Sequence, residues 1–504
     1  MILYYYYYYI YIALLTIHSR PKSMSLLVFF TVFFGVVLSL VAGSLNRVEY
    51  QTLVVTRLES PTPLRPDDEF LAWVVDPNTL SDLVSGSEPA TSFHVGLAHR
   101  DALHAGNSSG EELFKLRLDR DAARVATLAA NRTRPKDFSS SVVSGLAQGS
   151  GEYFTRLGIG TPPSYAFMVL DTGSDVAWLQ CAPCRRCYSQ TEPIFDPRRS
   201  RTYAAVPCAA SLCRRLDTSG CDTRRGACLY EVSYGDGSAT MGDFSIETLT
   251  FRSGARLPRV ALGCGHDNQG LFVAASGLLG LGRGPLSLPS QAASRLSRRF
   301  SYCLIDRTSP SSKPPSRSSS LIFGASAVPR ASTGVAYTPM IRNAKMDTFY
   351  YVDLIGISVG GARVPGVELK LDRTSGRGGV IVDSGTSVTR LARPAYEAVR
   401  DSFRAGASEL KAAPGGFSLF DTCYDLTGKS VVKVPTVTLH LAGGASVALP
   451  AENYLIPVDT KGTFCFAFAG TESGVSIIGN IQQQGFRVVF DAARSRIGFS
   501  PRGC

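Results

Sequence analysis

Histidine is scarce in this sequence: its 504 residues include six histidines, and none of them stands in a His-Glu-x-x-His pattern. A zinc hydrolase needs clustered imidazole or carboxylate ligands, so we expect no metal site and no cofactor. The glycines Gly280, Gly282 and Gly284 are not followed by the lysine of a phosphate-binding loop. Neither metal-dependent nor nucleotide-dependent chemistry is therefore expected.

Long apolar runs are confined to the first 43 residues. The run Ser25–Gly43 has the length of a signal peptide and ends in small residues, and Met24 just before it is a candidate start of translation. We predict a signal region over residues 1–43, with a longer signal or a membrane anchor as the alternative. The mature protein is expected to be secreted, to the extracellular space or cell wall, without a stable membrane anchor.

Cysteine is missing from residues 44–147, whereas the later part of the chain holds all twelve. The same segment carries both glycosylation sequons, at Asn107 and Asn131, and a helical pattern over residues 110–131. A disulfide-rich enzyme usually has cross-links in every permanent domain. We therefore predict a removable propeptide over residues 44–147, with an ordinary N-terminal domain as the alternative.

The net charge of +11 is unevenly distributed. Residues 44–147 have more acidic than basic side chains, and we expect carboxylates such as Glu111 and Glu112 to hold this segment against a basic enzyme and to release it in acid. The later part of the chain is basic, and its loops indicate either a solvated face or a contact with acidic polysaccharide. Nucleic acid is not an expected partner, because the loops lack interleaved aromatic residues. The loop arginines are Arg185, Arg186, Arg198, Arg199, Arg201, Arg214 and Arg215.

Short runs rich in aromatic and β-branched residues, such as residues 350–359 and 431–441, predict a protein made mainly of strands and turns. From about Gln148 the chain also repeats itself. An apolar strand leads into Asp171-Thr172-Gly173-Ser174, and another leads into Asp383-Ser384-Gly385-Thr386. Each motif is followed later by an apolar pair and a glycine, at residues 278–280 and 477–479. Two similar β-rich lobes with a central cleft are predicted, over residues 148–325 and 326–504.

The two aspartates carry the functional prediction. Each follows a predicted strand and precedes a glycine that permits a tight turn. Two carboxyl groups held close together share one proton, because they cannot both ionise. Such a pair supplies the base that activates water and the acid that protonates an amide. We predict Asp171 and Asp383 as the catalytic pair, with the hydroxyl groups of Ser174 and Thr386 fixing the carboxylates.

These residues resemble the motifs of the pepsin-like aspartic proteases over the whole of residues 148–504. Within that family, Cys181, Cys184 and Cys187 are similar to the insertion of the plant nepenthesin-like group. The resemblance implies a bilobal, mainly β fold, a monomer, and an endopeptidase that hydrolyses protein or peptide substrates at acidic pH. Its further motifs are Gly151-Glu152-Tyr153-Phe154, Gly160-Thr161-Pro162, Trp178, Tyr234-Gly235-Asp236-Gly237-Ser238 and Gly479-Asn480-Ile481-Gln482-Gln483-Gln484.

The resemblance also implies roles for individual residues. Tyr234, Gly235 and Asp236 would lie on a hairpin that closes over the substrate, with Tyr234 bonded to Trp178. Thr172 and Ser384 would link the two lobes beneath the aspartates. The implied disulfides are Cys181–Cys184, Cys187–Cys264, Cys208–Cys228, Cys213–Cys221, Cys303–Cys504 and Cys423–Cys465.

Three alternatives stay open at this point. The cysteine cluster could bind zinc or an iron cluster, although an exported protein favours disulfides. A relative of the same fold could be a catalytically silent, secreted binding protein. A basic chain with an unusual N-terminus could also be a DNA-associated protease of plastids, although no nucleic-acid module is recognised.

Overall fold

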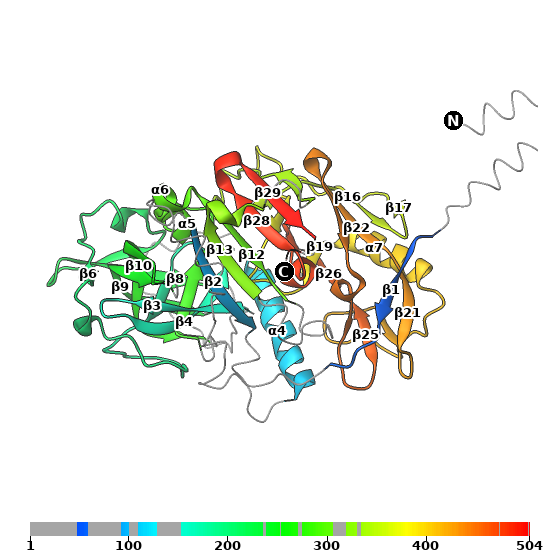
Figure 1. The fold of residues 1–504 in the computed structure, drawn as a ribbon, viewed down its shortest axis with the longest axis horizontal. Helices are drawn as coiled ribbons and strands as arrows, with labels where there is room; N and C mark the ends of the chain where they lie inside the picture. Colours follow the sequence, from blue (N-terminus) through cyan, green and yellow to red (C-terminus); the bar gives the residue numbers. More distant parts are fainter. Residues whose placement is uncertain are drawn as a thin grey trace, which may run out of the picture. The chain divides into compact units, whose positions relative to one another are not determined.

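The computed structural model describes most of the chain after residue 47 (Figure 1). All of the described residues belong to one compact unit, Val48–Cys504. None of their helices is long and apolar enough to cross a membrane. Predictions that concern residues 1–43, Asn107, Asn131, Gly235, Asp236 or Cys504 lie outside this part. The described ranges are 48–58, 92–99, 109–128, 153–234, 238–251, 254–270, 275–305, 319–329, 334–472, 474–501 and 503.

The largest sheet has 15 strands and joins the two lobes: eleven strands lie in residues 153–324, three in residues 336–500 of the second lobe, and one in residues 92–99. Its strands, in spatial order, are β14 (Ala336–Pro339), β29 (Arg496–Ser500), β28 (Arg487–Asp491), β12 (Arg299–Cys303), β13 (Ser319–Gly324), β2 (Ser92–His99), β3 (Tyr153–Ile159), β4 (Ser164–Asp171), β11 (Gly277–Gly280), β5 (Trp178–Gln180), β10 (Arg256–Gln269), β9 (Ala239–Thr250), β8 (Ala227–Ser233) and β7 (Ser219–Asp222), with β6 (Ala204–Ala205) beside β9.

The second lobe contains smaller sheets. A five-stranded sheet has the order β15 (Tyr351–Val352), β18 (Val380–Val382), β27 (Ser476–Ile478), β19 (Thr389–Ala392) and β26 (Phe468–Thr471). A four-stranded sheet has the order β17 (Ala362–Arg363), β16 (Leu354–Val359), β22 (Val437–Leu441) and β23 (Ser446–Leu449). A three-stranded sheet has the order β20 (Cys423–Asp425), β25 (Thr463–Phe466) and β24 (Leu455–Pro457). The predicted mainly β, two-lobed fold is confirmed.

Helices are few among the described residues. The longest are α4 (Gly110–Leu128) and α7 (Arg393–Gly406); α5 (Leu288–Gln291), α6 (Ala293–Leu296) and α8 (Asn480–Gln483) are single turns. The longest helix, α4, begins with a capping box in which Ser109 N–H donates to Glu112 Oε2 at 2.8 Å and Glu112 N–H donates to Ser109 Oγ at 3.2 Å. The helix expected over residues 110–131 is therefore present, over Gly110–Leu128.

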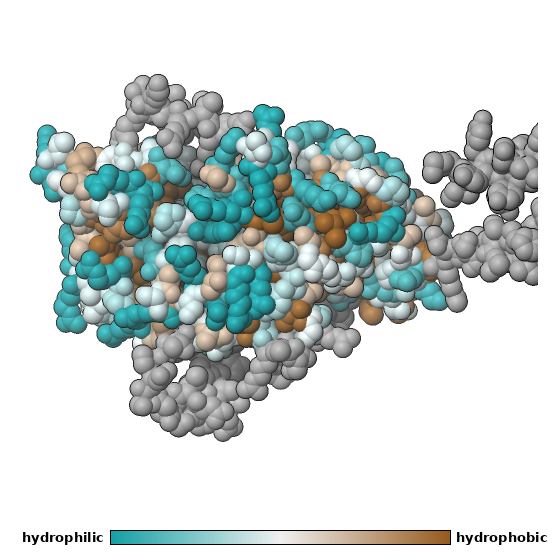
Figure 2. Space-filling model, turned by 90° about the horizontal axis from the view of Figure 1, so that it is seen from above, coloured by the Kyte–Doolittle hydropathy of each residue, from teal (hydrophilic) through white to brown (hydrophobic). Residues whose placement is uncertain are grey.

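The core follows from the alternation of apolar residues that predicted the strands. In β22, for example, Val437, Leu439 and Leu441 are buried, and the residues between them are partly exposed. The cluster that these residues join extends into the first lobe, where Phe300 stacks on Phe490 with ring centroids 4.6 Å apart. On the face seen in Figure 2, hydrophilic residues cover most of the described surface, and hydrophobic residues lie among them in small patches.

The segment over residues 44–147 is joined to both lobes. Strand β1 (Tyr50–Val54) pairs with β21 (Val431–Pro435) in the second lobe. Strand β2 lies between β13 and β3 in the large sheet. Helix α4, drawn in cyan in Figure 1, lies between the strands of the two lobes. The described parts of this segment are therefore packed on the two lobes and do not form a separate domain.

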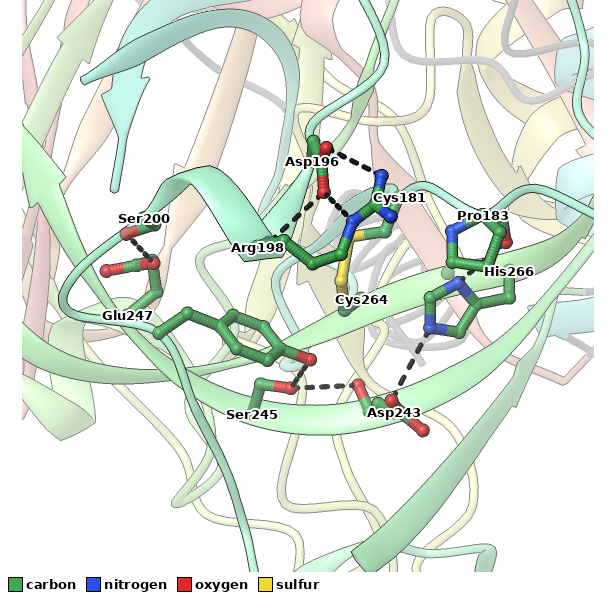
Figure 3. The surroundings of a disulfide bond; sticks show 12 residues. Cys181, Pro183, Asp196, Arg198, Ser200, Asp243, Ser245, Glu247, Cys264 and His266 are labelled. Atoms are coloured by element: carbon green, nitrogen blue, oxygen red, sulfur yellow. Dashed lines mark hydrogen bonds and ion pairs between the residues drawn. A yellow bond between two sulfur atoms is a disulfide. The ribbon is translucent and has the colours of Figure 1, made fainter. Parts of the chain in front are cut away.

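The disulfides of the first lobe differ from the predicted pairing. The bonds are Cys181–Cys264 and Cys184–Cys187, rather than Cys181–Cys184 and Cys187–Cys264. The parallel pairing of β5 with β10 decides this, because Cys181 N–H donates to the carbonyl of Gly265 at 2.8 Å and so lies beside Cys264. Figure 3 shows this bond close to Asp243 and His266 of neighbouring strands.

A second pair of predicted disulfides is also wrong. The bonds are Cys208–Cys221 and Cys213–Cys228, rather than Cys208–Cys228 and Cys213–Cys221. Cys213 and Cys228 are both buried in one hydrophobic cluster, whereas Cys208 and Cys221 lie nearer the surface. The bond Cys423–Cys465 is present as expected. No described cysteine is free, so the alternative of a metal bound by the cysteine cluster is excluded.

Candidate active site

The two predicted aspartates stand at equivalent places in the two lobes. Asp171 ends β4, which pairs in parallel with β11, and Gly280 is its register partner. Asp383 directly follows β18, which pairs in parallel with β27, and its N–H donates to the carbonyl of Ile478 at 3.2 Å. The apolar pairs at residues 278–279 and 477–478 therefore lie in β11 and β27, the strands beside the two aspartates.

Gly280 and Gly479, the glycines that follow those pairs, leave room for the two aspartate loops. A Cβ atom on Gly280 would lie 2.2 Å from the carbonyl oxygen of Asp175. A Cβ atom on Gly479 would lie 2.5 Å from the carbonyl oxygen of Ser387. Asp175 and Ser387 each stand four residues after an aspartate, so both glycines serve the same steric purpose.

Each carboxylate accepts the same hydrogen bonds in its own loop. Ser174 Oγ donates to Asp171 Oδ2 at 2.7 Å, and Thr386 Oγ1 donates to Asp383 Oδ2 at 2.6 Å. The backbone N–H groups of Gly173 and Gly385 donate to the other oxygen of each aspartate, at 2.9 Å and 3.0 Å. Both aspartates are 1% exposed, so these donors replace water around each charge.

Thr172 and Ser384 join the two loops reciprocally. Thr172 N–H donates to Ser384 Oγ at 3.2 Å, and Ser384 N–H donates to Thr172 Oγ1 at 2.8 Å. Gln483, whose role was not assigned from the sequence, lies below this contact and donates from Nε2 to the carbonyl of Asp383 at 3.2 Å. These bonds place the two carboxylates in a fixed relation across the lobe boundary.

Tyr234 and Trp178 are in contact as the resemblance implied. Trp178 Nε1 donates to the Tyr234 hydroxyl group at 2.6 Å. Tyr234 directly follows β8, and its N–H donates to the carbonyl of Ser238, which precedes β9. The described ends of the β8–β9 hairpin are therefore closed by a backbone hydrogen bond.

An arginine that was not singled out from the sequence binds both aspartates. Arg124 lies on α4, and its Nη2 is 2.7 Å from Asp171 Oδ1 and 2.9 Å from Asp383 Oδ2. Its Nε donates to Asp383 Oδ2 at 3.0 Å and to Thr386 Oγ1 at 3.2 Å. One guanidinium group thus bridges the carboxylates of both lobes.

This ion pair keeps Arg124 charged. Burial opposes the positive charge, but attraction to Asp171 and Asp383 outweighs burial, and the pKa of the Arg124 guanidinium is raised above its ordinary value. The charged guanidinium thus occupies the space between the carboxylates of the two lobes.

Other residues of α4 are also held by the second lobe. Phe114 and Leu118 are buried in a cluster with Phe420, Ile456 and Ile481. Further along the helix, the side chain of Asp121 is fully buried.

Asp121 forms an ion pair at 2.5 Å with Arg390 of β19. It also accepts hydrogen bonds from the N–H groups of Ser387 and Val388. Helix α4 is thus anchored by apolar packing and by the ion pairs of Asp121 and Arg124.

The charges that hold α4 are not the ones expected. Glu111 pairs with Lys115 of the same helix, and Glu112 caps the start of the helix, so neither binds the lobes. Of the recurring apolar residues that predicted the helix, Leu113 and Val125 are buried, whereas Leu116 is 39% exposed. The spacing of Arg117, Arg120 and Arg124 on one helical face was the available signal, but such a row is ordinarily solvated.

The seven loop arginines are all exposed. Two of them bind neighbouring carboxylates: Arg186 pairs with Asp267 at 2.8 Å and Arg198 pairs with Asp196 at 3.0 Å. Among the described residues, no group of three or more histidine, cysteine, aspartate or glutamate side chains could hold a metal ion. Asp171, Asp383 and Arg124 are bound to one another where the two aspartate loops meet.

Comparison with known proteins identifies the family. The family models described as xylanase inhibitor N-terminal and xylanase inhibitor C-terminal match residues 153–325 and 349–501. Aspartyl protease family protein 2 of Arabidopsis thaliana is 62% identical over 461 residues, which cover 88% of this chain and 91% of that protein. The chain belongs to the pepsin-like aspartic protease family.

Two further relatives support the expected group within this aspartic protease family. Protein ASPARTIC PROTEASE IN GUARD CELL 2 of Arabidopsis thaliana is 46% identical and covers 83% of this chain and 89% of its own length. Aspartic proteinase nepenthesin-1 of Nepenthes gracilis is 38% identical and covers 82% of this chain and 91% of its own length. The predicted resemblance to the plant nepenthesin-like group and to aspartic protease in guard cell is confirmed.

A solved structure shares the fold at low sequence identity. The crystal structure titled edgp has a TM-score of 0.59 and 20% identity, and covers 82% of this chain and 96% of its own. At this identity the likeness concerns the architecture alone, because one fold can carry different functions.

Proposed function

We propose that this protein is a secreted aspartic endopeptidase that is made as an inactive precursor, works in acid and uses Asp171 and Asp383 to activate one water molecule. The observation that carries the proposal is the bridge from Arg124 to both aspartates. This bridge supports the pair as the functional centre and would give the precursor a means of inhibition. Protein or peptide substrates are the corresponding partners.

The chemistry follows from the symmetry of the two loops. With one proton on the pair, the ionised carboxylate accepts a proton from water as the water oxygen attacks the amide carbon. The protonated carboxyl donates to the substrate, and the C–N bond then breaks as the amine leaves with a proton. The hydroxyl and backbone donors around each carboxylate hold the oxygens in place without themselves reacting. Activity is expected to have its maximum at roughly pH 3 to 6, because the shared proton is lost above that range.

Arg124 would inhibit this reaction by its position. Its Nη2 bridges the two carboxylates, so it excludes a water molecule that must bind to both. Acid is expected to favour release of the segment, because an ion pair is lost when its carboxylate is protonated. Residues 44–147 would then leave as a propeptide after a cut near residues 140–150.

Several other features agree with export of the active protein. The disulfides Cys181–Cys264 and Cys423–Cys465 favour an oxidising compartment. Two complete carboxylate loops favour catalysis over a silent binding role. A contact of the exposed arginines with acidic polysaccharide remains a prediction from the sequence, and a plastid location or a DNA partner gains no support from the described residues.

The test measures peptide cleavage during the first minutes after purified precursor is moved to about pH 5. The wild-type precursor should show a lag while it shortens itself. Arg124→Gln should start about tenfold faster or more, because the bridge is lost. Lys115→Gln removes an exposed cation from the same helix and should keep the wild-type lag.

Two outcomes would count against the proposal. Equal lags in all three proteins would show that Arg124 does not inhibit. A secreted, fully active form that begins near Ser44 would show that residues 44–147 are permanent. To separate a folding defect from activation, Arg124→Gln is also made together with Asp383→Asn, so that the protein stays uncut and its thermal unfolding can be measured.

A further inference from the structure

Asp121 occupies a buried site with its own set of hydrogen-bond donors. The carboxylate is met by a guanidinium group, that of Arg390, at 2.5 Å and by two backbone N–H groups, those of Ser387 and Val388. Asp121 is fully buried and Arg390 is 5% exposed. This is the donor set of a carboxylate-binding site, with a cation and convergent N–H groups on one side of the ligand.

The second lobe supplies every donor of this site. Arg390 lies on β19, and Ser387 and Val388 lie in the turn before it. Nε of Arg390 is buried and has no hydrogen-bond partner among the described residues. When helix α4 leaves, the Arg390 guanidinium and the two N–H groups lose the carboxylate that they bind. In a protein that has released the helix, these donors are open to another acceptor of the same kind.

The site also lies at the catalytic centre. Ser387 is the residue after Thr386, whose hydroxyl donates to Asp383. On the helix side, Asp121 stands three residues before Arg124, and three residues of α-helix advance about 4.5 Å along the axis. An extended peptide advances about 3.3 Å per residue, so a side chain that reaches this site belongs to a residue close to the cut bond.

Burial raises the pKa of the Asp121 carboxyl, while Arg390 and the two N–H groups oppose that rise. An apolar side chain would leave all three donors unsatisfied. An amide would satisfy part of the set but would present an N–H₂ group to a cation. The hydrogen-bond donors of the site therefore favour a carboxyl group over an apolar or an amide side chain.

We propose that Arg390 and the backbone N–H groups of Ser387 and Val388 form a substrate subsite for an acidic side chain, which Asp121 fills in the precursor. The subsite selects Asp or Glu at one position within three residues of the cut bond, on one side of it only. This inference rests on the proposed function, since it requires that the helix leaves and that peptides are cut in the same cleft.

The test uses the processed, secreted protein and a set of peptides of one sequence, in which each position in turn carries Asp or its neutral counterpart Asn. One position should show a preference for Asp of about tenfold or more in kcat/KM. Arg390→Met should remove that preference while cutting of the Asn peptide continues. Arg390→Glu should shift the preference at the same position towards Lys.

A matched control comes from the same region. Arg393 begins α7 and pairs with Glu472 on the surface, so Arg393→Met removes a nearby arginine without touching the subsite. It should keep the Asp preference. If Arg390→Met is not secreted, the comparison of Asp and Asn peptides with wild-type protein still tests the proposed subsite.

The outcomes separate the two proposals. Wild-type protein that cuts peptides with equal rates for Asp and Asn at every position would overturn the subsite and leave the protease proposal standing. Wild-type protein that cuts no peptide would overturn the proposed function itself. An Asp preference that persists in Arg390→Met would show that a group other than Arg390 distinguishes Asp from Asn.

Discussion

The loops that carry Asp171 and Asp383 are alike for three residues after the aspartate and differ at the next. In both loops a glycine N–H and a hydroxyl group bind the carboxylate. After that, Asp175 folds its side chain inward, where it accepts hydrogen bonds from Gly284 N–H and Thr348 Oγ1. Ser387 instead turns its N–H group to Asp121 of the helix.

This difference shows which parts of the two loops are symmetric and which are not. The hydrogen-bond donors to the two carboxylates are the same in the first four residues of each loop, as the proposed catalytic step requires. The next residues differ, and Asp121 of the helix is bound at the second loop. The two loops are therefore symmetric around the carboxylates and asymmetric at Asp175 and Ser387.

The largest expected effect tests the symmetric part. Asp171→Asn and Asp383→Asn should each lower kcat/KM by about 10³-fold or more, because a single carboxyl cannot act as both acid and base. The measurement is peptide cleavage by purified protein, with thermal unfolding as the control for folding. A variant that keeps more than about a hundredth of the activity would contradict the shared-proton mechanism.

A smaller effect is expected from the hydroxyl donors. Ser174→Ala and Thr386→Val each remove one hydrogen bond to a buried carboxylate and should lower kcat by roughly 10- to 100-fold. Equal losses would show that the two loops contribute equally to the reaction. Losses that differ by more than about tenfold would show that one carboxylate depends more on its own loop than the other does.

The smallest effect concerns the residues at which the loops diverge. Burial raises the pKa of Asp175 to about 6, although Thr348 and Gly284 donate to it. An acid whose pKa is raised on folding gives stability below its unfolded pKa, near 4, and loses it as the pH rises through 6. Asp175→Asn does not titrate, so its stability relative to wild type should rise by about 2 kcal/mol between pH 4 and pH 7.

Ser387→Ala is the matching change in the other loop. The Ser387 hydroxyl group is buried and has no hydrogen-bond partner among the described residues, so its removal should alter stability by less than about 0.5 kcal/mol at every pH. Thermal unfolding across pH, with Asp171→Asn added so that the protein cannot cut itself, measures both variants. A flat difference for Asp175→Asn would contradict the raised pKa.

The fold and the aspartate loops were predictable because their signals are local. An apolar strand, an aspartate, a glycine and a hydroxyl residue lie next to one another in the chain, and the repeat of this pattern indicated two lobes. Ser174 and Thr386 each donate to an aspartate three residues earlier in the chain, so these hydrogen bonds could be predicted without knowing which distant residues are in contact.

The disulfides and the helix contacts could not be predicted in the same way. The spacing of Cys181, Cys184 and Cys187 fits two pairings equally well, and the choice depends on the parallel register of β5 and β10. Arg124 is separated from Asp383, and Asp121 from Arg390, by more than two hundred residues. The row of arginines on the helix does not say which distant residues such a buried ion pair joins.

Helix α4 is covalently attached to the site that it covers, through the stretch that ends where β3 begins at Tyr153. A tethered segment meets its site at a local concentration set by the length of the connecting chain, commonly in the millimolar range, and dilution of the protein does not lower it. One cut in residues 129–152 changes this relation at once. The whole segment with β1, β2 and α4 is then held by noncovalent contacts alone, and its occupancy falls with dilution, so leaving a crowded secretory compartment would itself favour its loss.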